Sequence, residues 1–262
     1  MGLFEKKWVL ITGASSGIGK AFAIRLASEG ANLVLVARHE DVLNQLAKGL
    51  SEQHHIKTFV IPQDLSHAHA PEAVFHATQD AHITIDVLIN NAGFGVYGKL
   101  HETSLECNQE MLMLNIMALS SLTQLFLPPM VRRHAGIIIN ISSIAGFFPL
   151  PYFANYAASK AFVLSFTEAL WGEYKKEGIQ FLCVCPSSTA TQFFTVAGLT
   201  PGQEKLDSPE QVVEQTLKAL KKNRIYVLCG SIRNYIAAQL PRIFTHQFLV
   251  KTLEPIMKRR SK

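Results

Sequence analysis

A tyrosine and a lysine lie one helical turn apart in the hexapeptide "NYAASK", residues 155–160. On a helix, Tyr156 and Lys160 would point the same way, because positions i and i+4 share a face. An unperturbed phenol has a pKa of about 10, but a cation within a few ångströms favours the phenolate. The pair could therefore transfer protons. Taken alone, a surface pair is the better interpretation, so the surrounding residues must decide.

Seven continuously apolar runs alternate with segments of helical spacing, as in parallel strands that are covered on both faces. After the first run, Ile18, Phe22 and Leu26 recur every four residues, and Gly30 is placed to end that helix. The pattern predicts a Rossmann-type, doubly wound α/β sheet of about seven strands. We expect one domain, 1–262, with a substrate-covering or oligomerisation segment from residue 195. The runs are 8–12, 32–37, 58–61, 86–90, 136–142, 180–185 and 224–229.

The stretch "TGASSGIG", residues 12–19, joins the first predicted strand to the first helix. Gly13 would permit a tight turn, Gly17 a close approach of backbone to a pyrophosphate, and Gly19 close helix–strand packing. The N-terminus of the helix offers free N–H groups and a positive dipole end to phosphates. These features predict a dinucleotide site.

The end of the second predicted strand distinguishes the two nicotinamide cofactors. An NAD site needs an acidic residue there for the ribose 2′-hydroxyl, but the chain reads "LVLVARHE", with Arg38 after Ala37 and no acid before Glu40. A guanidinium suits a 2′-phosphate. We therefore predict NADP(H) in preference to NAD(H); the alternative is a solvated surface arginine.

Seven ordered landmarks then carry a family resemblance. They are "TGASSGIG", "DL" (64–65), "NNAG" (90–93), Asn115, "NISS" (140–143), "YAASK" (156–160) and "PSSTAT" (186–191). The chain resembles the short-chain dehydrogenase/reductase family in its single-domain branch. Residues 127–163 are similar to 3-ketoacyl-CoA reductases and hydroxysteroid dehydrogenases.

The resemblance implies a Ser-Tyr-Lys-Asn catalytic set. Tyr156 would be the general acid/base, and Lys160 would lower its pKa and hold the nicotinamide ribose. The family's serine lies 13 residues before the tyrosine, which selects Ser143 over Ser142 to orient the substrate carbonyl. Asn115 would kink a helix and organise a water relay; its alternative is an ordinary amide inside a helix.

The resemblance also implies contacts along the cofactor. Asp64 and Leu65 would contact the adenine, and Thr191 would reach the nicotinamide carboxamide. The motif "PSSTAT" departs from the family's PGxxxT, because Ser187 replaces the glycine. The expected cofactor-binding residues are Gly13, Ser15, Ser16, Gly17, Ile18, Gly19, Arg38, Asp64, Leu65, Asn91, Ala92, Gly93, Tyr156, Lys160, Pro186, Thr189 and Thr191.

Other kinds of chemistry have weaker support. His67 and His69 lack a third metal ligand with convincing spacing, so no metal is expected. No hydrolase motif GxSxG is present. Cys183 and Cys185 fall in a buried run, which favours reduced cysteines and a cytoplasmic protein. No signal peptide and no apolar stretch long enough to span a membrane is expected.

The substrate is expected to be hydrophobic, because aromatic residues flank the motifs. A fatty acyl, steroid-like, retinoid or terpenoid ketone or alcohol fits such a lining, although some of the rings could simply fill the core. An alternative function is a non-catalytic NADPH-binding regulator, which would not need the four catalytic residues together. The aromatic residues are Phe94, Phe147, Phe148, Tyr152, Phe153, Phe193 and Phe194.

The C-terminal segment is strongly basic. Residues 221–262 hold ten Lys and Arg and one acid, a net charge of +9, while the first 220 residues have a net charge of −4. We expect weak association with a membrane surface and no nucleic-acid partner. The alternative is a solvated helix with basic ends. A homodimer or homotetramer is expected from the family.

Overall fold

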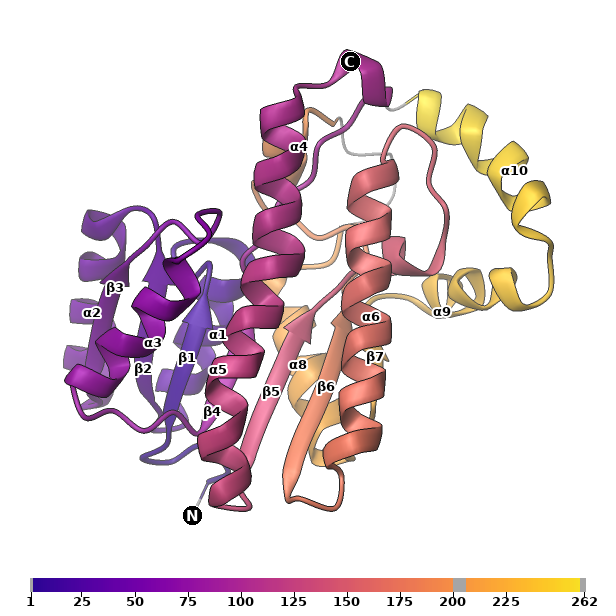
Figure 1. Ribbon diagram of the computed structural model, residues 1–262. Coiled ribbons are helices and arrows are strands. Elements are labelled where there is room, and N and C mark those ends of the chain that lie inside the picture. The colour runs from indigo at the N-terminus through magenta and orange to yellow at the C-terminus, as the bar shows by residue number, and fades with distance from the viewer. Residues whose placement is uncertain (1, 200–205, 260–262) are drawn as a thin grey trace.

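The central sheet of the computed structural model has seven parallel strands, and the structure describes residues 2–199 and 206–259. The strand order is β3-β2-β1-β4-β5-β6-β7 (Figure 1). Each strand lies within two residues of a predicted apolar run, so the predicted fold class is confirmed. The strands are β1 (Trp8–Thr12), β2 (Asn32–Ala37), β3 (Thr58–Pro62), β4 (Val87–Asn90), β5 (Gly136–Ile141), β6 (Ile179–Cys185) and β7 (Tyr226–Leu228).

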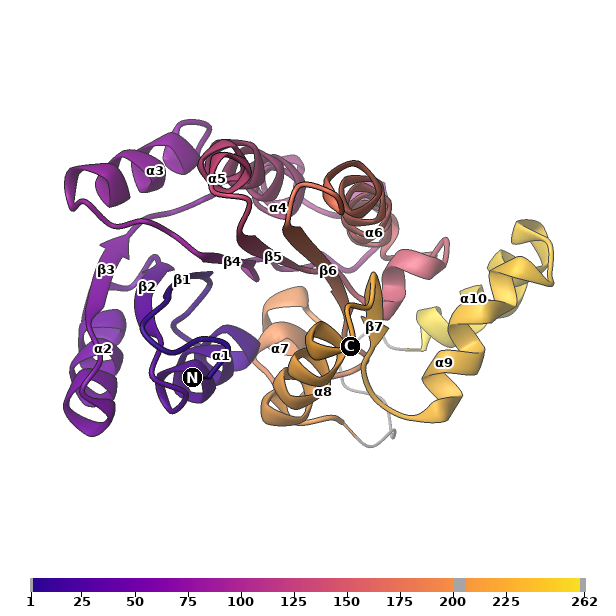
Figure 2. The same ribbon diagram turned by 90° about the horizontal axis from the view of Figure 1, so that it is seen from below.

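Helices cover both faces of this sheet (Figure 2). One core cluster packs α1 (Gly17–Ala27), α2 (Glu40–His54) and α8 (Pro209–Lys221) on one face. A second packs α3 (Ala70–Asp80), α5 (Leu119–Arg132) and α6 (Ala154–Tyr174) on the other. The remaining elements are η1 (Leu100–Glu102), α4 (Leu105–Leu112), η2 (Met113–Ala118), η3 (Ile144–Phe147), α7 (Phe193–Ala197), α9 (Ile232–Gln239), η4 (Leu240–Arg242) and α10 (His246–Lys258).

The two halves of the sheet diverge at β1, which pairs with β2 on one side and β4 on the other. Loops that leave the carboxyl ends of β1 and β4 turn to opposite faces, and such a switch point is where open α/β sheets bind ligands. The helix after β1 ends at Ala27, earlier than Gly30 suggested, and Gly30 follows with φ 79°. The glycine therefore shapes the turn into β2.

One long helical run contradicts the expectation that no segment is apolar and long enough to span a membrane. By length and composition, Leu105–Arg132 would suffice. In this structure, however, it packs on the sheet, where Leu122, Phe126 and Met130 are buried in the core. We therefore describe it as a core helix. It consists of α4, the π-helical turn η2 and α5.

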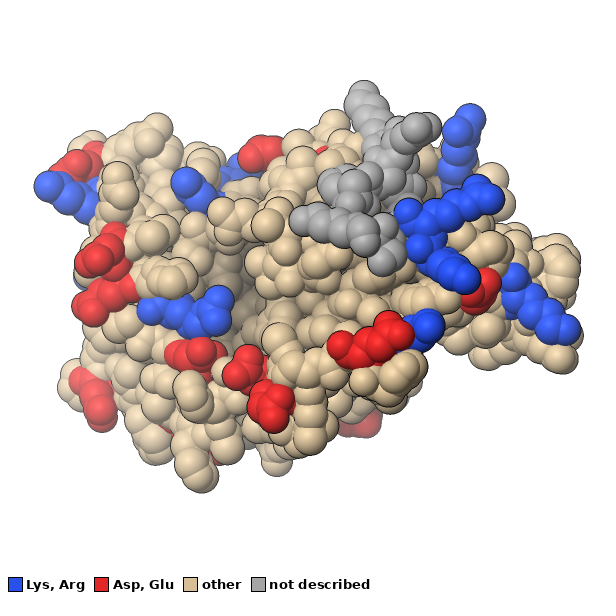
Figure 3. Space-filling view, turned by 90° about the horizontal axis from the view of Figure 1, so that it is seen from above, with Lys and Arg blue, Asp and Glu red and all other residues tan. Residues whose placement is uncertain are grey.

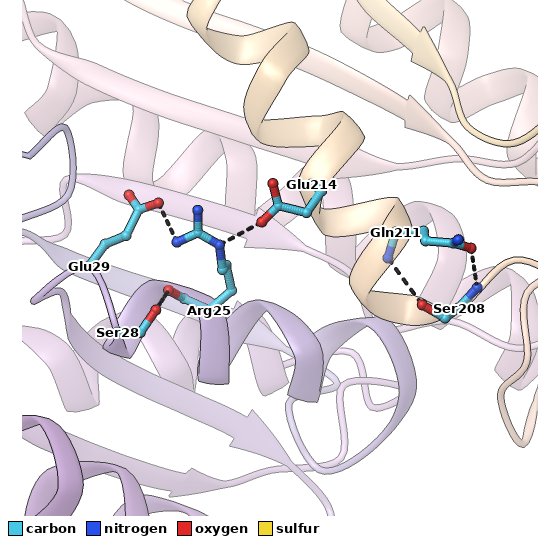
Figure 4. A network of polar contacts seen from close by, with 6 residues as sticks. All are labelled: Arg25, Ser28, Glu29, Ser208, Gln211 and Glu214. Atoms are coloured by element: carbon cyan, nitrogen blue, oxygen red, sulfur yellow. Dashed lines mark hydrogen bonds and ion pairs between the residues drawn. The ribbon is translucent and has the colours of Figure 1, made fainter.

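The phosphate-loop helix α1 is tied to α8 at the surface (Figure 4). Arg25 donates to Glu214 at 2.7 Å and also pairs with Glu29 in its own helix. Ser208 and Gln211 cap the N-terminus of α8 reciprocally. Ion pairs this exposed contribute about 0 to 1 kcal/mol each, so the stability of this contact comes from the apolar core that the two helices share.

Gly19→Ala is expected to destabilise the fold by about 1 to 3 kcal/mol, because the new methyl would lie 2.2 Å from the Gly13 carbonyl oxygen. Gly49→Ala is the matched control. A Cβ at Gly49, inside α2, meets nothing within 4 Å, so it should stabilise by about 0.5 to 1 kcal/mol. Urea unfolding of both variants measures the difference; a Gly19→Ala protein as stable as the parent would contradict the packing.

Candidate active site

Tyr156 and Lys160 lie on the first turns of α6 and are both buried, with 7% and 5% of their surface exposed. The Lys160 Nζ donates to the Ile141 carbonyl oxygen at 3.0 Å. It also lies 5.8 Å from the centroid of the Tyr156 ring. The interpretation as a surface pair is therefore wrong: a cation and a phenol share the interior at the carboxyl end of β5.

The two serines after β5 point in opposite directions, as neighbours in extended chain do. The Ser142 hydroxyl is buried and donates to the Lys160 carbonyl oxygen at 2.7 Å. The Ser143 hydroxyl instead lies toward Tyr156, whose pKa it lowers, and its Oγ accepts from the Ala145 N–H at 3.1 Å. Of the two hydroxyls, Ser143 is the one beside the phenol. Its role toward a substrate stays a prediction.

Asn115 lies in the π-helical turn η2, an irregularity common at functional sites. Its Nδ2 donates to the Phe94 carbonyl at 2.9 Å and to Ser159 Oγ at 3.1 Å. Its Oδ1 accepts from the Phe94 N–H at 3.2 Å. A Cβ on Gly93 would lie 2.8 Å from this oxygen and 3.4 Å from the Lys160 Nζ. Asn115 thus fixes the loop after β4 against the lysine; the water relay stays a prediction.

Burial dominates the proton affinities of the pair. It raises the pKa of Tyr156 to about 12, against the opposing effect of the Ser143 hydrogen bond. It lowers the pKa of Lys160 to about 8. The expected lowering of the Tyr156 pKa by Lys160 is therefore not found: burial raises this pKa, and the opposing effect comes from Ser143. A phenol that is neutral at pH 7 is suited to donate a proton.

The phosphate loop fits a pyrophosphate. Gly13 and Gly17 have φ values of 65° and 52°, which side chains rarely adopt. A Cβ on Gly17 would lie 3.0 Å from Thr191 Cγ2, so this loop faces the one after β6. At the start of α1, Ser16 makes no side-chain capping hydrogen bond and no acid lies in the first turn. The helix N-terminus is therefore left to an anion.

Other predicted residues of this region have structural contacts. Ser15 lies in the turn before Ser16, while Ile18 packs on the sheet core. Asn91 Nδ2 donates to the Thr12 carbonyl at 2.8 Å. Thr12 Oγ1 accepts from the N–H groups of Asn91 and Ala92, at 2.9 and 3.0 Å. Thr12 was not predicted, although it begins the glycine motif; it joins the ends of β1 and β4.

The ends of β2 and β3 bring Arg38 and Asp64 together. Arg38 is exposed. Burial would raise the pKa of Asp64, but hydrogen bonds from Ser66, and then the charges of Arg38 and His67, lower it below its usual value. Leu65 is buried in the core, so its side chain packs there. A guanidinium at this edge of the predicted adenosine site remains free to meet an anion.

The loop after β6 explains the departure from PGxxxT. Ser187 does not have a positive φ, so its position does not require glycine. Its hydroxyl donates to Asp207, and the Thr189 hydroxyl donates to the Ser187 carbonyl at 3.0 Å. The Pro186 carbonyl accepts from the Ile144 N–H at 2.9 Å. Asp207, which sequence reasoning missed, thus anchors the loop that carries Thr191.

Aromatic rings surround Tyr156 in one apolar cluster. Figure 3 views the molecule from the side of the carboxyl ends of the strands, where the surface is hollowed. Phe153 stacks on Tyr156 with centroids 4.4 Å apart, and Phe193 lies at 5.2 Å. Phe94, Tyr152 and Phe194 belong to the same cluster. Phe147 does not: it packs with Tyr226 in a separate cluster beneath β6 and β7. Its inclusion among the substrate residues is therefore wrong, and Phe148 also lies outside the cluster around Tyr156.

Residues 2–199 and 206–259 contain no group of three or more His, Cys, Asp or Glu that could hold a metal ion. The cysteines are free, with Cys183 and Cys185 fully buried and Cys107 exposed. The predicted burial of Cys183 and Cys185 is confirmed.

Known proteins resemble the chain along nearly all of its length. Residues 7–200 match the family described as short chain dehydrogenase. A very-long-chain 3-oxoacyl-CoA reductase of Anas platyrhynchos is 33% identical over 96% of this chain and 81% of its own length. The Mus musculus protein of that name is 34% identical over 87% of this chain and 75% of its own length.

Solved structures agree. A 7beta-hydroxysteroid dehydrogenase superposes with a TM-score of 0.87 at 27% identity, covering 97% of this chain and 100% of its own. A short-chain dehydrogenase from Sphingobium yanoikuyae in complex with NADPH gives a TM-score of 0.82 at 31% identity, covering 90% of this chain and 93% of its own. The match spans the phosphate loop, the YxxxK helix and the loop after β6, and the chain therefore belongs to the short-chain dehydrogenase/reductase family of oxidoreductases.

Proposed function

We propose that this oxidoreductase is an NADP(H)-dependent reductase of hydrophobic ketones, acting reversibly on the corresponding alcohols. The observation that carries the proposal is the buried Tyr156, which contacts Ser143 and Lys160 on one side and the rings of Phe153 and Phe193 on the other. A proton donor that is packed against aromatic rings suits a carbonyl group carried by an apolar molecule.

The residues have separable tasks. The bound nicotinamide would supply the hydride, and the loop at Gly13 and Gly17 with the N-terminus of α1 would hold its pyrophosphate. Tyr156, neutral at pH 7, would donate the phenolic proton to the carbonyl oxygen during reduction. Ser143 would hold that oxygen by a hydrogen bond. Lys160, an ammonium below pH 8, would hold ribose hydroxyls and stabilise the phenolate that remains.

NADP(H) is the proposed cofactor because Arg38 follows β2 where NAD sites have an acid. Arg38 is exposed, and its charge acts on Asp64 at the end of the neighbouring strand. A forked guanidinium can bind the 2′-phosphate bidentately, whereas the neutral 2′-hydroxyl gains less from it.

The proposed substrates are 3-oxoacyl thioesters or steroid-like ketones. The 3-oxoacyl-CoA reductases and the hydroxysteroid dehydrogenase similar to this chain are named for such molecules. The cluster around Tyr156 adds Met111, Leu199 and Met257, which are apolar and uncharged. A non-catalytic regulator is not favoured, because it would not need an ammonium buried beside a phenol and a serine.

Tyr156→Phe is expected to lower kcat by about 10² to 10⁴ while NADPH binding persists, because only the transferable proton is lost. Ser143→Ala should lower kcat about a hundredfold. Ser142→Ala is the matched control, since its hydroxyl serves the Lys160 backbone; it should keep most of the activity. NADPH oxidation with 3-oxoacyl thioesters and steroid ketones, beside NADPH fluorescence titration, measures both effects. If kcat falls equally in the two serine variants, Ser143 is not the serine that binds the substrate carbonyl.

Arg38→Ala is expected to raise the KM for NADPH about 10- to 100-fold and to leave the KM for NADH nearly unchanged. The estimate corresponds to losing about 1.5 to 3 kcal/mol of charged hydrogen bonding. Steady-state kinetics with both cofactors measure it, and Arg132→Ala, another exposed arginine, is the control. If both KM values rise together, Arg38 does not read the 2′-phosphate.

Lys160→Met is expected to remove activity and yet stabilise the fold by about 2 kcal/mol at pH 7, after allowance for the lost Ile141 hydrogen bond. The lysine pKa is about 8 in the folded protein and 10.5 in the reference state. Between these values the unfolded parent binds more protons, so its stability rises with pH. The advantage of the variant should shrink from pH 8 toward pH 10.5.

Urea unfolding at several pH values measures this trend. Lys176→Met, at an exposed lysine, is the control and should show no such change. An advantage of Lys160→Met that stays constant across the range would mean that the buried ammonium is not destabilising.

A further inference from the structure

The last two helices expose an unusual amount of apolar surface. Of sixteen large hydrophobic side chains exposed on the described residues, eight fall between positions 232 and 256. Folded proteins rarely leave such residues clustered without a partner. We name this set the C-terminal apolar surface: Ile232, Tyr235, Ile236, Ile243, Phe244, Phe248, Val250 and Ile256.

Several of these residues lie close together on the surface. Ile232, Tyr235 and Ile236 share one face of α9, at positions i, i+3 and i+4, and Ile232 is 72% exposed. Ile243, in the turn between the helices, is 75% exposed. Phe248 stacks on Phe244 at the start of α10, with centroids 5.1 Å apart. In Figures 1 and 2 both helices project from the edge of the molecule beyond β7.

Part of α10 is packed against the rest of the protein. Leu249 and Met257 are buried. The Tyr97 hydroxyl donates to the Met257 carbonyl, and the Tyr152 hydroxyl donates to Glu254 at 2.8 Å. The exposed side chains of α10 therefore belong to an anchored helix and not to a loose tail.

The charges within this C-terminal segment are almost all positive. Between residues 229 and 259, Glu254 is the one acid, and it is directed inward to Tyr152. Blue side chains gather over the C-terminal helices at the right of Figure 3. The exposed basic residues of the same span are Arg233, Arg242, Lys251, Lys258 and Arg259.

We propose that the C-terminal apolar surface and its basic residues dock α9 and α10 onto an anionic lipid bilayer. Apolar side chains on one face, flanked by Lys and Arg, are the composition of helices that lie in a membrane interface. Each basic residue near an anionic surface adds about 1 kcal/mol of attraction. The proposal concerns binding alone and does not depend on the proposed cofactor or substrate.

Two other partners fit less well. A second copy of the chain, docked symmetrically through the same surface, would bring like charges together, and the one acid on α9 and α10, Glu254, is already bonded to Tyr152. A nucleic acid would use the basic residues but gain little from exposed isoleucines such as Ile232 and Ile243. A bilayer satisfies both the charge and the apolar area.

Vesicle sedimentation tests the proposal with the full-length protein. We expect binding to phosphatidylcholine vesicles that contain phosphatidylglycerol, and much weaker binding to phosphatidylcholine alone. Ile232→Ser with Ile243→Ser should lower the partition coefficient about tenfold or more, and Lys251→Gln with Lys258→Gln should lower it by a similar factor. Leu105→Ser, at a leucine 66% exposed on α4, is the control and should bind like the parent.

Three results would overturn the proposal: no binding to the anionic vesicles, binding unaffected by the isoleucine pair, or an equal loss in the Leu105→Ser control. Light scattering without vesicles supplies the remaining test. If the isoleucine pair converts an oligomer into a smaller species, the surface is an interface between copies of the chain. Circular dichroism and NADPH binding confirm that each variant is folded.

Discussion

Burial of the Lys160 ammonium is the constraint on which the site depends. Moving a charge out of water is costly unless it is hydrogen-bonded, and burial lowers the pKa of this lysine to about 8. Its Nζ can donate three hydrogen bonds, and the Ile141 carbonyl oxygen accepts one of them at 3.0 Å. The ammonium group is thus held at the carboxyl end of β5, and it can donate further hydrogen bonds to a ligand.

Three strand ends must be fixed around that charge. Thr12 joins β1 to β4 through two backbone N–H groups, and Asn115 binds both the N–H and the carbonyl of Phe94. The π turn at Asn115 rotates this amide toward the loop without ending the helix that covers the sheet. Core packing supplies the stability, while these few polar side chains position the loops that a ligand would meet.

The fold was predictable because the strands of a doubly covered parallel sheet are continuously apolar, and because glycines with positive φ mark the phosphate loop. The predictions that failed depended on burial and on contacts between distant segments, which the sequence pattern does not encode. The direction of the Tyr156 pKa depends on how deeply the folded chain buries the phenol, and Phe147 could be assigned to a different cluster only once η3 was placed. Likewise, the contact of Ser187 with Asp207 joins segments twenty residues apart.

The C-terminal helix α10 connects the outer surface to the interior of the site. Its Met257 belongs to the apolar cluster that contains Tyr156, and the Tyr152 hydroxyl, in the turn that leads to α6, donates to Glu254 of α10. Glu254, the one acid between residues 229 and 259, is bonded to Tyr152. The other charged side chains of this segment are all positive. The segment that carries these cations and isoleucines is therefore connected, through Met257 and Tyr152, to the aromatic cluster around Tyr156.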